Sequence, residues 1–96
     1  MNDNSQSRLS YITRTFIKPE EFPSLRGVSA QWIGNTIHLS FFFDGEISEQ
    51  AQEDASVLAA EIIAQFSEGF IEERYISLNP DQDLPNDPFL AYKRTG

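Results

Sequence analysis

Residues 28–43 read VSAQWIGNTIHLSFFF, and their pattern gives the clearest prediction of local structure in the chain. Apolar and polar side chains alternate on both sides of Gly34-Asn35, and a period of two residues is typical of a strand with one buried face. Glycine at the first central position of a two-residue loop suits a type II′ turn, which joins antiparallel strands. The stretch therefore predicts a β-hairpin. The two faces of its second strand are Ile37, Leu39, Phe41 and Phe43 on one side and Thr36, His38, Ser40 and Phe42 on the other.

Apolar spacing typical of helices flanks the hairpin on both sides. Residues 7–18 carry Leu9, Ile12, Phe16 and Ile17 on one helical face, although several β-favouring side chains in this segment leave a strand as the alternative. Residues 49–67 repeat apolar side chains at steps of three and four, which predicts a second helix. Ser48 is positioned to cap its first turn, and Gly69 marks its end.

The remainder of the chain completes a small α+β domain. A third strand is expected over residues 70–78 and a short fourth strand over residues 89–94, separated by a proline-rich and aspartate-rich surface loop. The predicted order is α-β-β-α-β-β. We expect a two-layer sandwich, in which a four-stranded, mainly antiparallel sheet carries both helices on one face. Residues 1–96 form a single domain in this interpretation, with a disordered tail over residues 1–6.

Composition excludes several classes of function. The chain has 96 residues with 15 acidic and 7 basic side chains, 0 cysteines and 1 histidine, and a net charge of −8. Thiolate chemistry is therefore absent, zinc and haem sites are nearly excluded, and no cofactor is expected. Negative charge argues against nucleic acid and anionic membranes as partners. The polar N-terminus lacks the pattern of a secretory signal, so we expect a cytoplasmic protein.

No motif in the sequence predicts catalysis. His38 has no neighbouring nucleophile or acid in the chain to make it a general base. The acidic stretch 81–87 resembles a calcium loop, but its sixth residue is not glycine and its twelfth is Tyr92 rather than glutamate. Glu72 and Glu73 are consecutive strand residues and point to opposite faces, so they cannot converge on one substrate atom. We therefore predict that the protein is not an enzyme and has no metal site.

The distribution of charge is the most informative feature. Between Arg26 and Arg74 there are nine carboxylates and no lysine or arginine. An acidic surface of this kind either keeps a protein soluble or docks a basic partner, with a few aromatic anchors for specificity. Trp32, Phe42 and Tyr75 are the candidate anchors; Trp32 is also a candidate core residue, and Phe42 is preferred. The residues expected to bind the partner are Asp44, Glu46, Glu53, Asp54, Glu61, Glu72, Glu73 and Phe42.

The segments 28–32, 36–49 and 59–66, together with Glu72-Glu73, resemble a family of small acidic bacterial proteins, the immunity proteins of toxin–immunity pairs, including those of contact-dependent growth inhibition. The resemblance implies a cytoplasmic inhibitor that binds a cognate toxin domain, often a basic nuclease. It transfers no individual binding residue. An acidic face can compete for the basic groove of a nuclease without chemistry of its own.

A second hypothesis belongs to a different class. The sheet face without helices, or an edge strand, could make the protein a self-associating structural subunit through Phe42 and its neighbours. The inhibitor hypothesis instead predicts a monomer or weak dimer that forms a complex with a basic protein.

Overall fold

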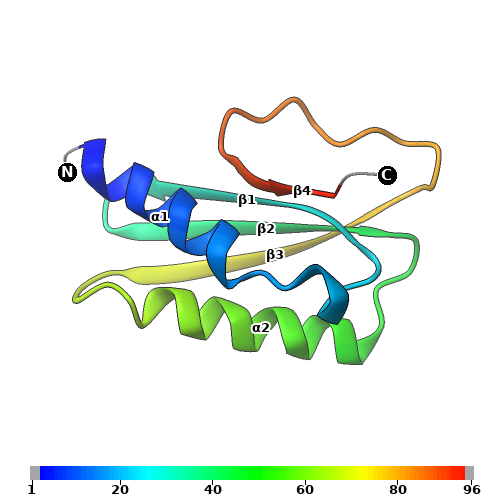
Figure 1. Cartoon of the computed structure of the whole chain (residues 1–96), viewed down its shortest axis with the longest axis horizontal. Helices are drawn as coiled ribbons and strands as arrows, with labels where there is room; N and C mark the ends of the chain where they lie inside the picture. Colours follow the sequence, from blue (N-terminus) through cyan, green and yellow to red (C-terminus); the bar gives the residue numbers. More distant parts are fainter. Residues whose placement is uncertain (1–2, 95–96) are drawn as a thin grey trace.

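The computed structural model describes residues 3–94, and the expected order of elements is confirmed (Figure 1). The elements are the helix α1 (Asp3–Phe16), the short 3₁₀ helix η1 (Pro19–Glu21), the strands β1 (Leu25–Ile33) and β2 (Thr36–Asp44), the helix α2 (Glu49–Ile63), and the strands β3 (Phe70–Leu78) and β4 (Leu90–Lys93). The α+β fold class is confirmed as well.

The hairpin is the centre of a four-stranded sheet with the order β3-β2-β1-β4. β1 pairs antiparallel with β2, from Ile33 opposite Thr36 to Leu25 opposite Phe43. Gly34 has a φ of 61°, and no residue type other than glycine has a positive φ in the described chain, which agrees with the type II′ turn. β4 is also antiparallel to β1, but β3 is parallel to β2, so the sheet is mixed. The parallel pairing follows because α2 carries the chain back along the sheet before β3 starts.

Both helices lie on the same face of the sheet, as predicted. α2 contacts β3 and β2, α1 contacts β1 and β4, and the two helices contact each other. The hairpin side chains that face the helices are buried, and together with the apolar stripes of α1 and α2 they form the core. The largest fully buried apolar side chains are Phe41, Phe43, Leu9, Leu25, Ile37, Leu39, Ile62 and Val28.

The N-terminal segment is a helix, which decides between the two alternatives left by the sequence. α1 begins at Asp3, inside the segment 1–6 for which a disordered tail is expected; residues 1–2 lie outside the described residues. The Gln6 side chain donates to the carbonyl of Ala30 at 3.0 Å and accepts from the backbone N–H of Trp32 at 2.9 Å. These bonds lie beyond the end of the β1–β4 pairing. Gln6 therefore supplies hydrogen bonds to the β1 backbone carbonyl and N–H groups that β4 does not reach.

α2 has the predicted start but ends earlier than predicted. The Ser48 hydroxyl accepts from the backbone N–H of Ala51 at 3.1 Å, as an N-cap should. The helix stops at Ile63 rather than at Ser67. Residues 64–69 turn the chain instead, because the N–H of Phe70 must reach the carbonyl of Asn35, 2.9 Å away, for β3 to start beside β2.

The second face of the sheet carries no helix, but part of it is covered. Residues 79–89 form the predicted long loop, and Leu84 lies against Gly27, where a Cβ atom added to the glycine would be only 3.1 Å from the leucine side chain. Phe42 is paired in register with Gly27 and Ile76 on this face. It is only 4% exposed, so its ring offers almost no surface to a partner or to a second copy.

Candidate protein-binding surface

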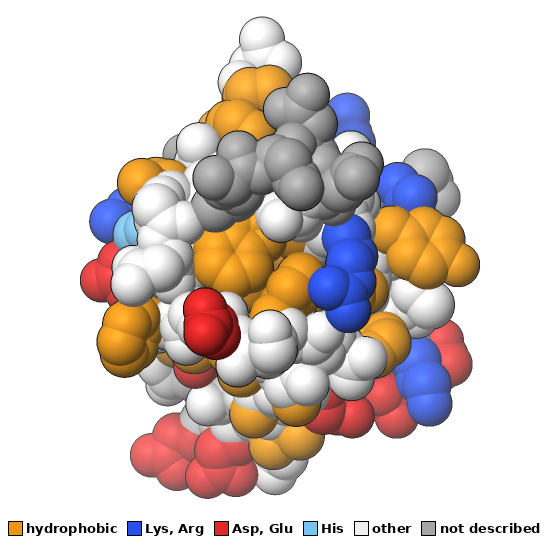
Figure 2. Space-filling view, turned by 90° about the vertical axis from the view of Figure 1, so that its left-hand side faces the viewer, with side chains coloured by type: hydrophobic (Ala, Val, Ile, Leu, Met, Phe, Trp, Pro, Cys, Tyr) orange, Lys and Arg blue, Asp and Glu red, His pale blue; other side chains and the backbone are white. Residues whose placement is uncertain are grey.

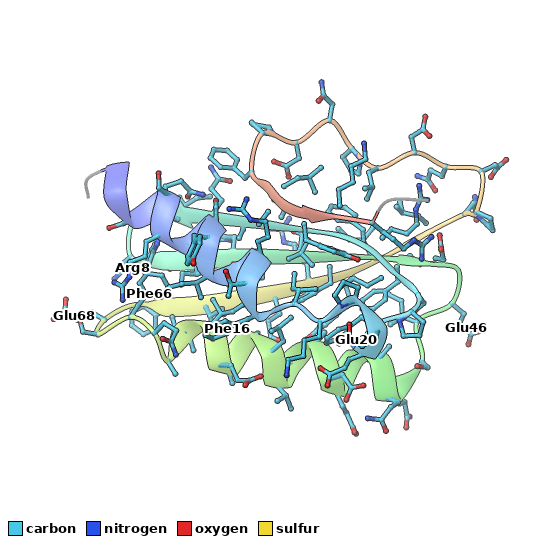
Figure 3. All side chains as sticks on the ribbon, viewed as in Figure 1. Arg8, Phe16, Glu20, Glu46, Phe66 and Glu68 are labelled. Carbon is cyan, nitrogen blue, oxygen red and sulfur yellow. The ribbon has the colours of Figure 1, made fainter. Side chains whose placement is uncertain are left out.

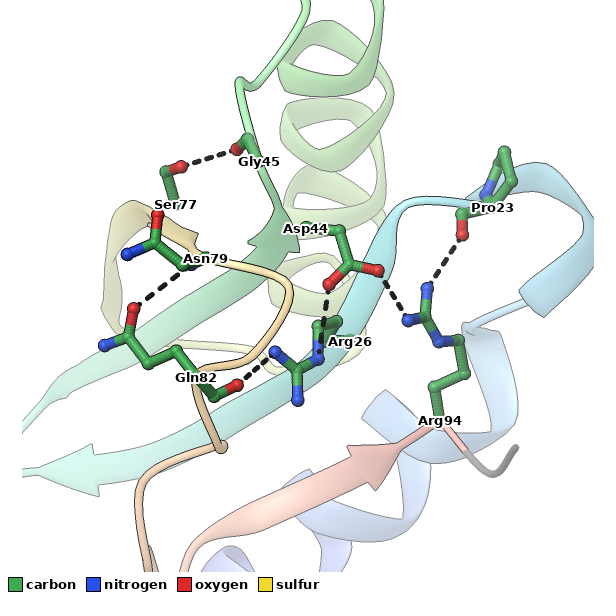
Figure 4. Close-up of polar contacts among 8 residues, drawn as sticks. All are labelled: Pro23, Arg26, Asp44, Gly45, Ser77, Asn79, Gln82 and Arg94. Atoms are coloured by element: carbon green, nitrogen blue, oxygen red, sulfur yellow. Dashed lines mark hydrogen bonds and ion pairs between the residues drawn. The ribbon is translucent and has the colours of Figure 1, made fainter.

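Asp44 is the first of the expected binding residues, and it is engaged within the chain. It ends β2, where its Oδ2 lies 2.5 Å from Arg94 Nη2 and its Oδ1 lies 3.4 Å from Arg26 Nε (Figure 4). Two guanidinium groups therefore neutralise one carboxylate, and they come from the end of the described chain and from the first hairpin strand. Asp44 contributes to structure rather than to a free acidic surface.

The same arginines also hold loops in place. Arg26 Nη1 donates to the carbonyl of Gln82 at 2.5 Å, and Arg94 Nη1 donates to the carbonyl of Pro23 at 3.0 Å (Figure 4). These contacts hold Gln82 of the loop against β1, and they hold the end of β4 against the segment that precedes β1. Arg26, Lys93 and Arg94 thus lie close together with Asp44 at one end of the sheet.

Glu72 and Glu73 lie on opposite faces of β3, as the strand period predicts. Glu72 Oε2 is 3.0 Å from His38 Nδ1 on the face without helices. Glu73 accepts a hydrogen bond from the Tyr75 hydroxyl on the helix-covered face. Burial raises the pKa of Tyr75 to about 12, and the hydrogen bond to the Glu73 carboxylate and the charge of that carboxylate act in the same direction. The Tyr75 ring stacks on Phe41 with centroids 5.7 Å apart. This candidate anchor is therefore partly buried against the core and offers only part of its surface to a partner.

The carboxylates of α2 are different, because they have no internal cation. Glu49, Glu53 and Glu61 are exposed, and Asp54 accepts from Gln50 Nε2 at 2.9 Å. Within the described residues, no ion pair joins any of these groups to a lysine or arginine. Acidic side chains gather in the lower part of Figure 2, on the α2 side of the molecule. Like charges left unpaired on one helix repel each other, which lowers the stability of the helix slightly.

The acidic groups of α2 form two stripes. Glu49 and Glu53 line a hollow beside Tyr75 of β3. Asp54 and Glu61 face the other way, toward η1. Glu46 is exposed just before the helix begins (Figure 3). The structure therefore groups the α2 carboxylates and Glu46 on the helical side of the domain, and places Glu72 on the opposite side of the sheet.

One residue of the acidic surface, Glu21, was not predicted from the sequence. Glu21 belongs to η1 and lines a groove together with Asp54 and Glu61 of α2. It lies before Arg26, outside the uninterrupted acidic segment on which the prediction concentrated. The sequence does contain a pattern that indicates a helical turn here, because Pro19 is followed by two glutamates, as is typical of the first turn of a helix.

The aromatic anchor Trp32 lies mainly against the core. Its ring meets Phe66 edge to face with centroids 5.2 Å apart, and the Arg8 guanidinium lies 4.9 Å from the centre of the Phe66 ring (Figure 3). Ile33 and Phe70 are more exposed, at 53% and 66%. They flank Thr36 in the sheet register and so share the face without helices.

Neither a metal cluster nor a membrane span is found in the part of the chain that the structure describes. No group of three or more histidine, aspartate or glutamate side chains there could hold a metal ion. None of the described helices is long and apolar enough to cross a bilayer.

Fold and surface together define a small α+β domain that displays unpaired carboxylates along one helix. The chain belongs to the MafI2 immunity protein family, whose model matches residues 22–96. The match covers the whole sheet and α2, and it confirms the resemblance to toxin–immunity proteins. A search of the curated proteins found no match. Family membership implies that the chain neutralises a protein toxin as a non-enzymatic inhibitor.

Proposed function

We propose that this immunity protein neutralises its toxin by binding a basic surface of the toxin through the carboxylates of α2. One observation carries the proposal: among the described residues, the carboxylates of Glu49, Glu53 and Glu61 have no ion-pair partner, whereas Asp44 is paired with two arginines and Glu72 lies beside His38. A basic partner supplies the missing charges. Asp44 and Phe42 are left out of the proposed surface, because one is neutralised and the other is buried.

A nuclease fits this role among possible toxins. Its substrate groove must be basic to bind a polyanion, and an acidic helix can occupy such a groove. Electrostatic attraction between the two surfaces accelerates association and is screened by salt. Delivery by contact-dependent growth inhibition, which the resemblance also implies, stays a prediction.

The test uses the cognate toxin domain and measures its association with this protein at increasing salt. Between about 0.05 and 0.5 M salt we expect the association rate to fall at least ~10-fold, because screening removes the long-range attraction. The double variant Glu49→Gln/Glu53→Gln should slow association by about 10-fold at low salt for the same reason.

Asp81→Asn/Asp83→Asn is the matched control. It removes the same charge from two exposed carboxylates of the loop that have no ion pair among the described residues. Association that is insensitive to salt, or that is equally slow in both double variants, would overturn the α2 surface.

A further inference from the structure

A groove separates α2 from the segment that joins α1 to β1. It encloses about 730 Å³, a volume within the range of clefts that bind ligands. One wall is formed by the end of α1 and by η1. The other is formed by α2, whose lining residues are spaced i, i+3, i+4 and i+7 and so share one side of the helix. These α2 residues are Asp54, Val57, Leu58 and Glu61.

The floor of the groove is apolar. Phe16 is half-buried, Phe22 is 7% exposed and Leu58 is 3% exposed. Val57 stands at the edge and is 61% exposed. Figure 3 shows Phe16, the last residue of α1, between the two helices, with Glu20 of η1 further along the chain. Phe22 and Leu58 are therefore almost fully covered, and the apolar surface that the groove leaves in contact with water belongs to Phe16 and Val57.

The charged side chains around this floor are mostly acidic. Glu21, Asp54 and Glu61 contribute three carboxylates, and Lys18 contributes one ammonium group. No ion pair joins Lys18 to them in the part of the chain that is described. A ligand that suits both features needs an apolar body and a positive end. Arginine has both, since its stem and guanidinium plane pack on aromatic rings while its donors bind carboxylates.

We propose that the groove receives an arginine side chain of the toxin. The stem covers Phe16 beside Val57, and the guanidinium is held among Glu21, Asp54 and Glu61. The inference rests on the proposed function and assigns it a specific contact. Lys18 is then a resident cation that weakens the field felt by the incoming arginine.

The groove also combines two parts of the chain. The family match begins at Phe22, so the α2 wall lies inside the matched residues, while Phe16, Lys18 and Glu21 precede them. A contact shared by these two parts is suited to distinguishing one toxin from another, because a change in either wall alters it.

The first test places a larger, positively charged side chain of this protein in the groove. Val57→Arg places a guanidinium at the groove itself, and we expect it to weaken binding to the cognate toxin domain at least ~10-fold. Tyr11→Arg is the matched control, because Tyr11 is also on a helix and is 62% exposed, against 61% for Val57. Both changes add one positive charge. Equal losses of affinity in the two variants would overturn the proposal.

The second test uses a variant that should bind the toxin domain more tightly. Lys18→Gln removes the resident cation, and we expect binding to tighten about 3- to 10-fold as the groove becomes more negative. Arg74→Gln makes the same change in net charge at an exposed residue of β3, and it should change affinity less than ~2-fold. Tightening that is equal in both variants, or absent in Lys18→Gln, contradicts the groove contact.

The two proposals fail in different ways. If association is salt-dependent and slowed by Glu49→Gln/Glu53→Gln, but Val57→Arg behaves like Tyr11→Arg, only the groove contact is wrong. If association is insensitive to salt and to the α2 charges, the acidic surface itself is wrong.

Discussion

Asp44 Oδ2 lies 2.5 Å from Arg94 Nη2, and this contact joins the end of β2 to the end of β4. The strands are not neighbours, because β1 separates them in the sheet. Arg26 approaches the same carboxylate from β1. A single acidic side chain therefore links three strands and the loop that Arg26 holds, which gives the Asp44 carboxylate a structural role independent of any partner.

Asp44→Asn should lower the free energy of unfolding by about 1–2 kcal/mol, because two partly exposed guanidinium groups lose their carboxylate. Urea denaturation would measure the loss. Glu46→Gln removes the next carboxylate in the chain, which is exposed and has no ion pair among the described residues, and should change stability by less than ~0.5 kcal/mol. The prediction is wrong if the two variants unfold at the same urea concentration.

Gly69→Ala should cost about 1–3 kcal/mol of stability. Gly69 has a φ of 129°, and a Cβ atom there would lie 3.0 Å from the Trp32 ring and 3.1 Å from the Asn35 carbonyl. Gly34→Ala is the comparison, because Gly34 also has a positive φ but nothing lies within 4 Å of a Cβ atom. We expect the Gly69 variant to lose more stability and to shift the fluorescence of the single tryptophan. Equal losses would mean that the Trp32 contact adds no cost.

Ser48→Ala should destabilise the protein by about 1 kcal/mol, since the backbone N–H of Ala51 loses its acceptor. Ser67→Ala serves as the control, because Ser67 is exposed and lies beyond the end of α2. Thermal unfolding followed by circular dichroism would compare them. A Ser67 variant as unstable as the Ser48 variant would contradict a specific role for the cap.

Stability should fall in alkaline solution partly through Tyr75. Its pKa is raised from 10.0 to about 12 in the folded protein, so folding favours the neutral hydroxyl. This contribution is complete below pH 10 and is lost as the pH rises toward 12. Tyr75→Phe should therefore lose less stability over that range than the unaltered protein, measured by urea denaturation at each pH.

Tyr11→Phe is the control for the loss of a tyrosine hydroxyl, because Tyr11 is exposed and the variant keeps Tyr75. Its stability should follow the pH dependence of the unaltered protein. The assignment to Tyr75 fails if both phenylalanine variants show the same slope.

Local pattern was sufficient to predict most of the elements. The alternation in residues 28–43, the apolar stripes of both helices, the Ser48 cap and the strand over residues 70–78 all appear in the structure. Each depends on residues that are close together in the chain, whose spacing alone defines a buried face. The same reasoning placed Glu72 and Glu73 on opposite faces, where His38 and Tyr75 meet them.

Tertiary contacts decided which charges are available to a partner. The composition near Asp44 is acidic, yet Arg94 comes from the far end of the chain to neutralise it. Phe42 alternates as an outward residue, yet it is buried on a face that a loop about forty residues later partly covers. Glu21 and Glu61 meet across one groove although forty residues separate them in sequence.

The strands, the helices and the excess of negative charge could therefore be predicted from the amino-acid sequence, because they depend on local spacing and composition. Only the folded chain decided where that charge stays unpaired, because ion pairs and burial depend on which distant segments the packing of the core brings together.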